Sequence, residues 1–506
     1  MRRVLFWQYW HKRDYNRLGS ALTPPSNSGV LMQIVLRGAA AGYEAEHTAR
    51  IFYPAAELSQ TLPDDTADLV LAVAHRHLLL VLVRQNGPTT WVQQRPPQGD
   101  ARTQEYALCR MLYTMLCGVT GIRPPWGMMT GVRPVRIIHD LRAAGESEEA
   151  IAEKFLGHFA CTPEKFKLAL GIADLQRPVL DAADPMDCSI YAGIPFCPTR
   201  CSYCSFVSRT VGDKATRALV QPYVDKLCRE LTAIRETADR CGLRIRTFYI
   251  GGGTPTSLGE KAFGRLLRAA SRLLAETGVS EFTVEAGRPD CFSPGKLAAM
   301  EAAGVNRISV NPQTFHDRTL KLIGRRHTVT DFYRAYAMVR QSAISVVNMD
   351  LIIGLPQESE ADIAYSLEQA KSLAPENLTV HTLTLKRSAP LFGSAMTLDA
   401  GAASRMVERG RSIAQAMGLA PYYLYRQHYM LGHLANIGYA KPGTESVYNI
   451  QMMEERHPVI GIGPASASKA PLADGHHLRK LNMPKNVATY AKSLPELCRK
   501  RAALFE

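Results

Sequence analysis

Apolar stretches of strand length alternate with helical stretches from about residue 185 to 395. Six strands are predicted, at SIYAGIP, RTFYI, EFTVEA, NRISVN, VVNMDLII and NLTVHTL. Between the first two, apolar residues recur every three or four positions, as on the buried face of a helix: Leu219, Tyr223, Leu227, Leu231 and Ile234. This alternation predicts a parallel sheet, built as an open doubly wound sheet or an incomplete barrel. In both, reactive groups lie at the C-terminal ends of the strands.

The N-terminal part of the chain has a different pattern. Residues 1–30 carry no clear period and end in the turn-rich TPPSNSG, which predicts a loose leader. LMQIVLRG, RIFYP, DLVLAVAH and HLLLVLVRQ then read as β-rich segments, followed by a helix through EYALCRMLYTMLCGVTG. Further helices are expected at about 135–144, 147–157 and 163–178. The punctuated DAADPMD closes a small α+β domain, so we place a boundary near 185 and predict four parts: 1–30, 31–184, 185–395 and 396–506.

Composition narrows the class of protein. The opening segment is too interrupted for a signal-peptide core, and no window is apolar enough to span a bilayer, so we expect a cytoplasmic protein without a membrane span. Sixty basic against 46 acidic side chains give a net charge of +14, which suits an anionic partner or a solvated basic surface. The basic residues are scattered and form no ladder with aromatic residues, so nucleic acid is not expected.

Three of the 11 cysteines lie within eight residues, in IPFCPTRCSYC directly after the first strand of the alternating region: Cys197, Cys201 and Cys204. Three thiolates this close can bind three irons of a cubane cluster and leave the fourth iron open to a substrate. A zinc site, which needs a fourth ligand, and unligated thiols are the alternatives. The scattered remaining cysteines are typical of a reducing compartment.

Other polar or glycine-rich positions also follow strands. GGGTPT comes directly after the second strand, where glycines allow close approach of a ligand or form a tight turn. Single polar residues mark the ends of later strands: Glu285, Asn311, Gln313 and Asp350. A charge inside an apolar strand is costly unless partnered, so we expect a ligand or an arginine to meet Asp350, with an internal salt bridge as the alternative.

From about residue 110 to its end, the chain resembles the oxygen-independent coproporphyrinogen III oxidase family of radical S-adenosylmethionine (SAM) enzymes, in particular the long branch called coproporphyrinogen dehydrogenase. The motifs that carry the resemblance occur in order: PPWGMMTGVRP, YAGIPFCPTRCSYCSF, YIGGGTPT, VNPQTF, MDLIIGLP, YYLYRQHYMLGHLANIGYAKPGTESVYN and GIGPASASK. The resemblance implies an α/β fold, an incomplete (β/α)6 barrel over 185–395, with an N-terminal α+β domain and a family-specific C-terminal extension.

The resemblance also implies a 4Fe-4S cluster and SAM as cofactors. The three loop cysteines would ligate three irons, and the amino and carboxylate groups of SAM would chelate the fourth. Further residues would contact the cofactors: Tyr191 and Phe196 beside cluster and SAM, Gly252, Gly253 and Thr254 at the methionine part, and Glu285, Gln313, Arg325 and Asp350 at its other polar groups. A second SAM beside the first is a further expectation.

The reaction implied by the resemblance belongs to heme and porphyrin biosynthesis. A 5′-deoxyadenosyl radical would start the oxidative decarboxylation of two propionates of coproporphyrinogen III, giving protoporphyrinogen IX. The partners would be this anionic tetrapyrrole and an unidentified electron donor and acceptor, and the basic charge would suit the four carboxylates of the substrate. One departure is Gly193, where shorter family members often have a histidine.

Two rival functions remain open. The first is a heme-binding chaperone of the same fold, which YAKPGTES also resembles, with His428, His433 or His457 as possible axial ligands or as ordinary surface and core residues. The second is a radical methyltransferase that opens the heme ring anaerobically. A chaperone would bind heme without decarboxylation, whereas the methyltransferase would consume heme and release a linear tetrapyrrole.

Overall fold

The computed structural model describes most of the 506 residues. The described ranges are 32–37, 43–53, 56–59, 68–74, 78–83, 90–95, 98–131, 133–206, 208–275, 277–384, 386, 388–391, 400–427, 430–472 and 477–506. The chain divides into two compact units, Met1–Arg123 and Pro124–Glu506. Among the described residues, no helix is long and apolar enough to cross a membrane. The predicted loose leader, 1–30, lies outside the described residues.

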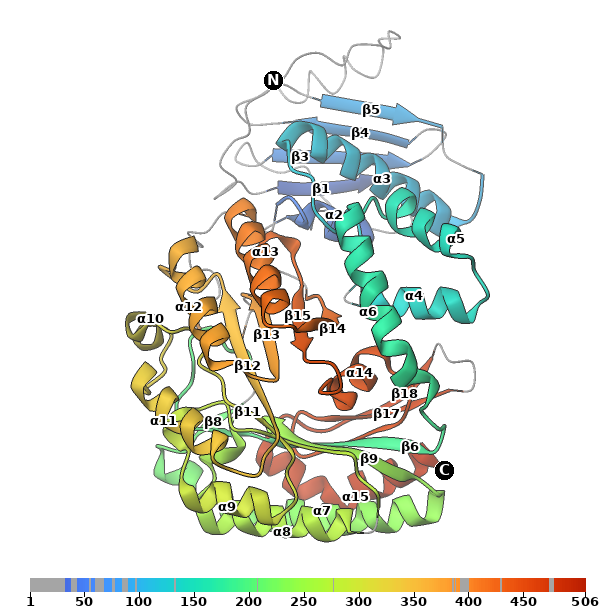
Figure 1. Cartoon of the computed structure of the whole chain (residues 1–506). Coiled ribbons are helices and arrows are strands. Elements are labelled where there is room, and N and C mark those ends of the chain that lie inside the picture. Colours follow the sequence, from blue (N-terminus) through green and yellow to red (C-terminus); the bar gives the residue numbers. More distant parts are fainter. Residues whose placement is uncertain are drawn as a thin grey trace. The chain divides into compact units, whose positions relative to one another are not determined.

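In its described residues, the first unit is a five-stranded sheet with two helices (Figure 1). The strand order is β2-β1-β3-β4-β5, with β1 parallel to β2 and β3, and with β3, β4 and β5 antiparallel. The elements are β1 Met32–Arg37, α2 Tyr43–Arg50, β2 Glu57–Ser59, β3 Asp68–Ala74, β4 Leu78–Val83, β5 Thr90–Gln94 and α3 Ala101–Thr120. Asp100 caps α3 by accepting a 2.9 Å hydrogen bond from the Thr103 amide.

The second unit is built on an 11-stranded sheet of order β14-β15-β13-β12-β11-β10-β9-β6-β16-β17-β18. From β6 to β13 the strands are parallel and stand in chain order, without the reversal that a doubly wound sheet requires. The incomplete barrel is therefore confirmed. Its strands are β6 Asp187–Ile194, β9 Arg244–Gly252, β10 Glu281–Glu285, β11 Arg307–Ser309, β12 Val346–Ile353, β13 Asn377–Thr382, β14 Ala420–Tyr425, β15 Asn436–Ala440, β16 Val459–Ile462, β17 Ala467–Pro471 and β18 Leu478–Asn482, and the short strands β7 Phe196–Cys197 and β8 Arg209–Thr210 form a separate parallel pair.

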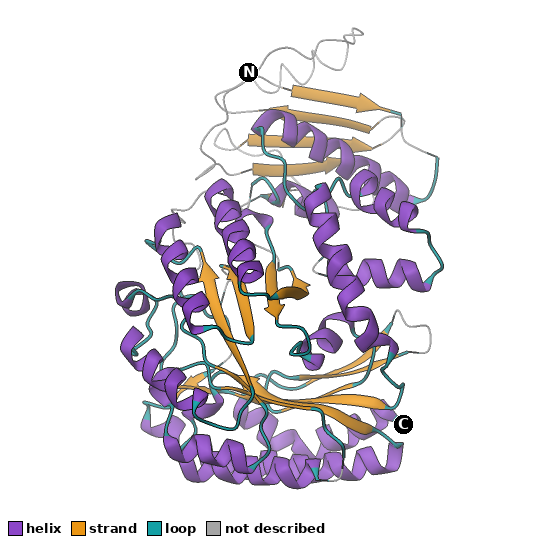
Figure 2. Cartoon of the chain, in the orientation of Figure 1, coloured by secondary structure: helices purple, strands orange, loops and turns teal. Residues whose placement is uncertain are grey.

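Helices cover the outer face of the parallel strands, as Figure 2 shows. Side-chain caps start many of them, including a capping box at Thr328 and another at Ser359. The helices are α4 Pro134–Ala143, α5 Glu148–Glu153, α6 Pro163–Asp181, α7 Lys214–Cys241, α8 Glu260–Leu274, α9 Pro294–Ala302, α10 Asp317–Leu322, α11 Val329–Arg340, α12 Glu360–Leu373, α13 Ala400–Ala416, α14 Val447–Glu454 and α15 Val487–Phe505. Short turns are η1 Lys154–His158, η2 Pro255–Ser257, η3 Pro289–Cys291 and η4 Leu431–His433.

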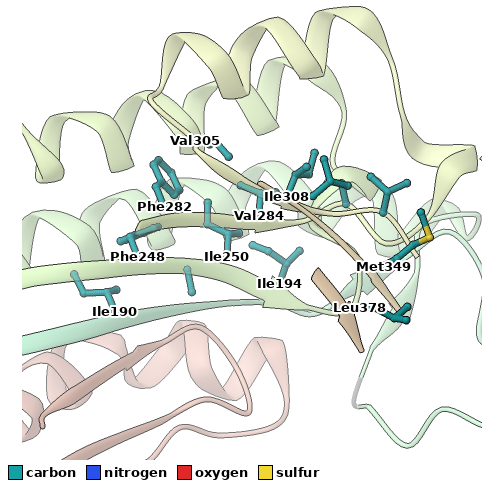
Figure 3. Packing of buried hydrophobic residues seen from close by; sticks show 14 of the residues in the cluster. Ile190, Ile194, Phe248, Ile250, Phe282, Val284, Val305, Ile308, Met349 and Leu378 are labelled. Carbon is teal, nitrogen blue, oxygen red and sulfur yellow. The ribbon is translucent and has the colours of Figure 1, made fainter. Parts of the chain in front are cut away.

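Alternation along the strands separates the core from the site. One set of alternate residues packs against the helices in the main hydrophobic cluster, including Ile190, Phe248, Val284 and Met349 (Figure 3). Because successive side chains of a strand point to opposite faces, the intervening residues face the inside of the partial barrel. Those intervening residues are mostly polar or aromatic, which makes the concave face suited to binding rather than to packing.

Two features of the N-terminal prediction differ from the structure. RIFYP was predicted as β-rich, but its arginine ends helix α2 and the following residues form a turn. The predicted boundary near 185 falls inside the larger unit, because α6 packs on α4 and β14. Gln176, for example, donates a 3.0 Å hydrogen bond to the Tyr422 carbonyl. The four predicted domain limits otherwise stay a prediction.

Candidate functional site

The three loop cysteines follow β6 at the C-terminal end of the barrel's first strand. Cys197 lies in β7, and its carbonyl accepts a 2.9 Å hydrogen bond from the Val211 amide. Cys201 and Cys204 lie in the next turn, closed by a 3.2 Å hydrogen bond from the Cys204 amide to the Cys201 carbonyl. All three are half-buried, so their thiols are both supported and accessible.

A glycine loop at the end of β9 packs directly against the cysteine loop. The amide of Gly253 donates to the Ile194 carbonyl, and that of Thr254 donates to the Phe196 carbonyl, each at 2.7 Å. A Cβ added to Gly253 would lie 2.5 Å from the Phe196 oxygen and 2.8 Å from Cys197 Sγ. Only glycine fits this approach, so the loop forms a cradle beside the cysteine sulfur.

The donor set fits an iron–sulfur cluster. Among the described residues, no three His, Cys, Asp or Glu side chains are grouped closely enough to hold a single metal ion. A cubane cluster does not require such a group, because each thiolate binds a different iron. Burial raises the pKa of Cys197 and Cys204 as free thiols. Two donors already face the sulfurs: Thr254 Oγ1 lies 3.6 Å from Cys197 Sγ, and Arg288 Nη1 lies 3.7 Å from Cys201 Sγ.

Glu285 joins the glycine loop to the aromatic lining of the barrel. Its carboxylate accepts a 2.7 Å hydrogen bond from the Tyr249 hydroxyl and a 3.0 Å bond from the Gly252 amide. Burial, with a smaller contribution from the negative charge of Asp350, raises the pKa of Glu285 to about 7. The carboxyl therefore changes protonation near neutral pH, and a cationic ligand would favour its charged form.

Asp350 is partnered by amides and a histidine, not by an arginine. Its two oxygens accept hydrogen bonds from Asn311 Nδ2 at 2.7 Å and Asn348 Nδ2 at 2.8 Å, and His381 Nε2 lies 3.6 Å away. Burial raises its pKa, but the contacts with His381 and Asn348 outweigh this, and the pKa is lowered overall. Among the described residues these amides and His381 hold the charge and no arginine pairs with it, so of the two expected partners the ligand stays a prediction.

Gln313 and Arg325 carry polar atoms without partners. Gln313 has a positive φ of 67°, and its amide donates to the Asp350 carbonyl at 3.0 Å, which ties it to β12. Arg325 Nη1 donates to the carbonyls of Asn311 at 2.7 Å and Gly287 at 3.2 Å. Gln313 Oε1 and Arg325 Nε are buried without a hydrogen-bond partner among the described residues. Such atoms are costly unless a ligand satisfies them, which fits a polar cofactor here.

Stacked tyrosines line the barrel beside Glu285. Tyr249 and Tyr448 stack with ring centroids 4.4 Å apart, and Tyr191 lies 6.0 Å from the Tyr249 ring. Phe196, by contrast, is fully buried and packs edge-on against Tyr223 in the core. The structure thus gathers Tyr191 with the polar residues of the barrel, whereas a cofactor contact of the Phe196 side chain stays a prediction.

Gly193 lies where little space is left for a side chain. A Cβ there would be 3.3 Å from the Pro464 carbonyl oxygen and 3.5 Å from that of Ile462. The Gly193 carbonyl also accepts a 2.5 Å hydrogen bond from the Tyr223 hydroxyl, which fixes this part of β6. The glycine is therefore suited to its packing against the C-terminal segment.

The protonation of Glu285 predicts a pH-dependent stability. Because its folded pKa of about 7 exceeds the ordinary 4.5, its contribution is complete below pH 4.5 and is lost as the pH rises through 7. When the pH is raised from about 5 to 8, we expect the free energy of unfolding of the cofactor-free protein to fall by about 2 kcal/mol more than that of the Glu285→Gln variant. Urea unfolding of both proteins at each pH measures this difference. Parallel pH profiles would show that Glu285 keeps its ordinary pKa.

A six-strand parallel partial barrel with three cysteines in the loop after its first strand defines a radical SAM protein. The model of the radical SAM superfamily matches residues 191–370. HemZ of Bacillus subtilis, described as an oxygen-independent coproporphyrinogen-III oxidase-like protein, is 38% identical over 377 residues, covering 73% of this chain and 75% of HemZ. The chain belongs to this oxygen-independent coproporphyrinogen III oxidase family of radical SAM enzymes, whose cofactors are a 4Fe-4S cluster and SAM.

Two further comparisons concern the fold and the range of activities among similar proteins. The heme chaperone HemW of Escherichia coli is 31% identical over 293 residues, covering 58% of this chain and 72% of HemW. The solved structure of HemN, the coproporphyrinogen III oxidase of Escherichia coli, has a TM-score of 0.50 and 20% identity, covering 64% of this chain and 73% of HemN. The HemN likeness supports the fold, and the HemW match keeps a second activity class in view.

Sequence reasoning missed several residues of the site. Tyr249, Tyr448 and His381 join it through packing between strands and helices far apart in the chain. Arg288 reaches Cys201 from the segment after β10. Tyr249 and His381 had a usable signal, because each alternates with apolar residues of a predicted strand. Tyr448 lies in the quoted motif that ends in TESVYN, but nothing in the sequence pairs it with Tyr249.

Proposed function

We propose that this protein catalyses the oxygen-independent oxidative decarboxylation of coproporphyrinogen III to protoporphyrinogen IX. The observation that carries the proposal is the 38% identity to HemZ across about three quarters of both chains. The polar concave face supports it, because carboxylates, amides and tyrosines converge at the ends of the parallel strands, beside the cysteine loop. The cytoplasm remains our proposed location.

In this proposal, each group of residues has one task. The loop cysteines ligate the cluster, and the glycine loop receives the methionine part of SAM. Unpartnered polar atoms and carboxylates of the barrel hold the remaining groups of SAM, and Tyr191 flanks the site. Together with the glycine loop, the residues assigned to SAM are Gly252, Gly253, Thr254, Glu285, Gln313, Arg325 and Asp350. Bound to the cluster, SAM supplies the 5′-deoxyadenosyl radical that abstracts hydrogen. A second SAM stays part of the proposal.

The protein must orient two propionates in turn and exclude competing reactions. Each propionate loses one hydrogen atom from its β-carbon, then carbon dioxide and one electron, and becomes a vinyl group. The electron leaves to an acceptor that is not identified. The protein's contribution is to hold the β-carbon close to the reactive carbon and to keep water away.

The chaperone alternative has weaker support from the described histidines. His457 is buried, and its Nε2 lies 2.7 Å from Ser189 Oγ. Burial lowers the pKa of His457 to about 4, as expected for a neutral core histidine. His433 lies in the short turn η4, and His428 is outside the described residues. His457 is therefore a poor candidate for an axial heme ligand, and the chaperone alternative gains no support from it.

An anaerobic assay tests the proposal. The reconstituted protein is incubated with dithionite, SAM and coproporphyrinogen III, and mass spectrometry follows 5′-deoxyadenosine, carbon dioxide and tetrapyrrole products. We expect protoporphyrinogen to accumulate through the three-propionate intermediate. Formation of 5′-deoxyadenosine without decarboxylation would reject this substrate, and stable heme binding or release of a linear tetrapyrrole would identify one of the alternatives.

Replacement of Asp350 tests the SAM assignment separately from catalysis. Because hydrogen bonds to a buried charged group are worth about 1.5–3 kcal/mol, we expect Asp350→Ala to bind SAM roughly ten- to a hundredfold more weakly. The cluster should keep its absorption, since Asp350 contacts none of the cysteines. Calorimetric titration of the reconstituted variant measures the affinity, with the exposed Asp239→Ala as the matched control. Equal affinities in both variants would remove Asp350 from the SAM site.

A further inference from the structure

An open basic cavity lies beside the cysteine loop, outside the residues assigned to SAM apart from Arg325. Its volume is about 930 Å³. The ionisable residues that line it are Arg200, Asp317, Lys321, Arg325, Arg326 and His327. Five of these six are basic residues, and the side chains of Arg200, Lys321 and Arg326 are exposed. A cavity of this composition attracts an anionic partner.

The cluster loop itself forms one wall of this cavity. Thr199 and Arg200, which line it, stand between Cys197 and Cys201 in the chain. Thr199 Oγ1 donates a 2.9 Å hydrogen bond to the carbonyl of Gly324, which also lines the cavity. A Cβ at Gly324 would lie 3.1 Å from the Arg200 oxygen, so the cysteine loop and the segment around Gly324 are closely packed. The cavity therefore adjoins the residue that directly precedes Cys201.

Arg288 connects this wall of the cavity to the cluster ligands. Its Nη1 lies 3.0 Å from Thr199 Oγ1 and 3.7 Å from Cys201 Sγ, and its side chain is almost fully buried. Asp290 holds the guanidinium through two 2.9 Å hydrogen bonds, and His327 Nδ1 lies 3.7 Å from the same carboxylate. Asp290 offsets the charge of the guanidinium, but its N–H groups still face the sulfur, and a hydrogen-bond donor at a cluster sulfur favours the reduced, more negative form of the cluster.

The exposed charges of the cavity are available to a partner. Within the described ranges, neither Lys321 nor Arg326 pairs with a carboxylate, and the one acid of the lining, Asp317, accepts a 2.7 Å hydrogen bond from the Val329 amide. A smaller cavity of about 230 Å³ includes Arg209 and Lys485. Strand β8 lies between the two cavities, since Arg209 lines the smaller cavity and Thr210 lines the larger one. The basic surface thus extends along the outside of the cluster loop.

We propose that this surface docks an acidic one-electron carrier protein that reduces the cluster. The proposal rests on the proposed cluster ligands and gives the unidentified electron donor a binding site. One electron passes from the reduced carrier to the cluster. The carrier is thereby oxidised by one electron and the cluster is reduced by one electron, and no bond forms or breaks. Charge complementarity favours a protein with an acidic face, because the basic groups continue beyond one cavity.

The test uses a purified flavodoxin as the probe, an acidic one-electron carrier, and needs no tetrapyrrole. The double variant Lys321→Glu/Arg326→Glu reverses two exposed charges of the cavity. Its matched control, Lys261→Glu/Arg272→Glu, makes the same change at exposed positions of α8, outside both cavities. Two measurements are made at several salt concentrations: the affinity for flavodoxin, with and without the cluster, and the stopped-flow rate of cluster reduction by reduced flavodoxin.

We expect the cavity variant to lose at least tenfold in affinity and in the bimolecular reduction rate at low salt, and to show a weaker salt dependence. Reduction by dithionite should be unchanged, which separates docking from a damaged cluster. The control should behave as the unmodified protein does. Equal affinity and rate in the two variants would overturn the proposal. Binding of inorganic pyrophosphate that is lost in the cavity variant while flavodoxin binding persists would instead identify a small-anion site.

Discussion

Cys201→Ala is expected to abolish the 4Fe-4S absorption of the anaerobically reconstituted protein. Cys201 is the middle ligand of the proposed cluster, and its loop has no fourth cysteine to replace it. A cubane that SAM must reach at its fourth iron needs all three thiolates of the loop. The variant should therefore retain far less than the roughly four irons and four sulfides of an intact cluster.

The control for this prediction is Cys228→Ala. Cys228 is also half-buried but lies on helix α7, outside the cluster loop. The Cys228→Ala variant should bind as much iron and sulfide as the unmodified protein does. It therefore controls for any general effect of removing a thiol. Circular dichroism of both variants checks that the fold persists. Unchanged iron and sulfide content in Cys201→Ala would refute the cluster assignment.

The sequence predicted the parallel strands because their apolar runs are separated by amphipathic helices. All six predicted strands are present, and the order in the sheet decides between the two architectures that the pattern left open. Strand order is set by long-range pairing, for which a single sequence carries no period. The further strands β14 to β18 extend the sheet on both sides, and their short segments have weak alternation.

The candidate site was predictable where chemistry follows directly from spacing or from a strand end. The cysteines lie within a few residues of the end of β6, and the glycines lie at the end of β9, so the local sequence places both groups. Asp350 was recognised as an unusual charge, but its amide and histidine partners depend on which strands are neighbours. Tyr448 comes from helix α14, almost two hundred residues after its stacking partner Tyr249, and only the folded chain brings the two together.

A buried ion pair ties the C-terminal helix to the barrel and predicts a large effect on stability. Glu230 on α7 is fully buried, and its carboxylate accepts hydrogen bonds from Arg501 and the Tyr490 hydroxyl on α15. The same carboxylate accepts a 3.3 Å hydrogen bond from the amide of Gly463, which follows β16. Three segments far apart in sequence therefore converge on one charge.

Arg501→Met would leave the Glu230 carboxylate buried without its cationic partner, a loss that costs about 3–5 kcal/mol. We expect a much lower urea midpoint for the unfolding of the larger unit. The control Lys500→Met removes an exposed charge that pairs with Glu496 on the same helix, and it should cost less than about 1 kcal/mol. Adding Glu230→Leu to Arg501→Met removes the uncompensated charge and should restore part of the lost stability. Equal midpoints for the two single variants would mean that solvent reaches Glu230 and that α15 is held by its apolar contacts alone.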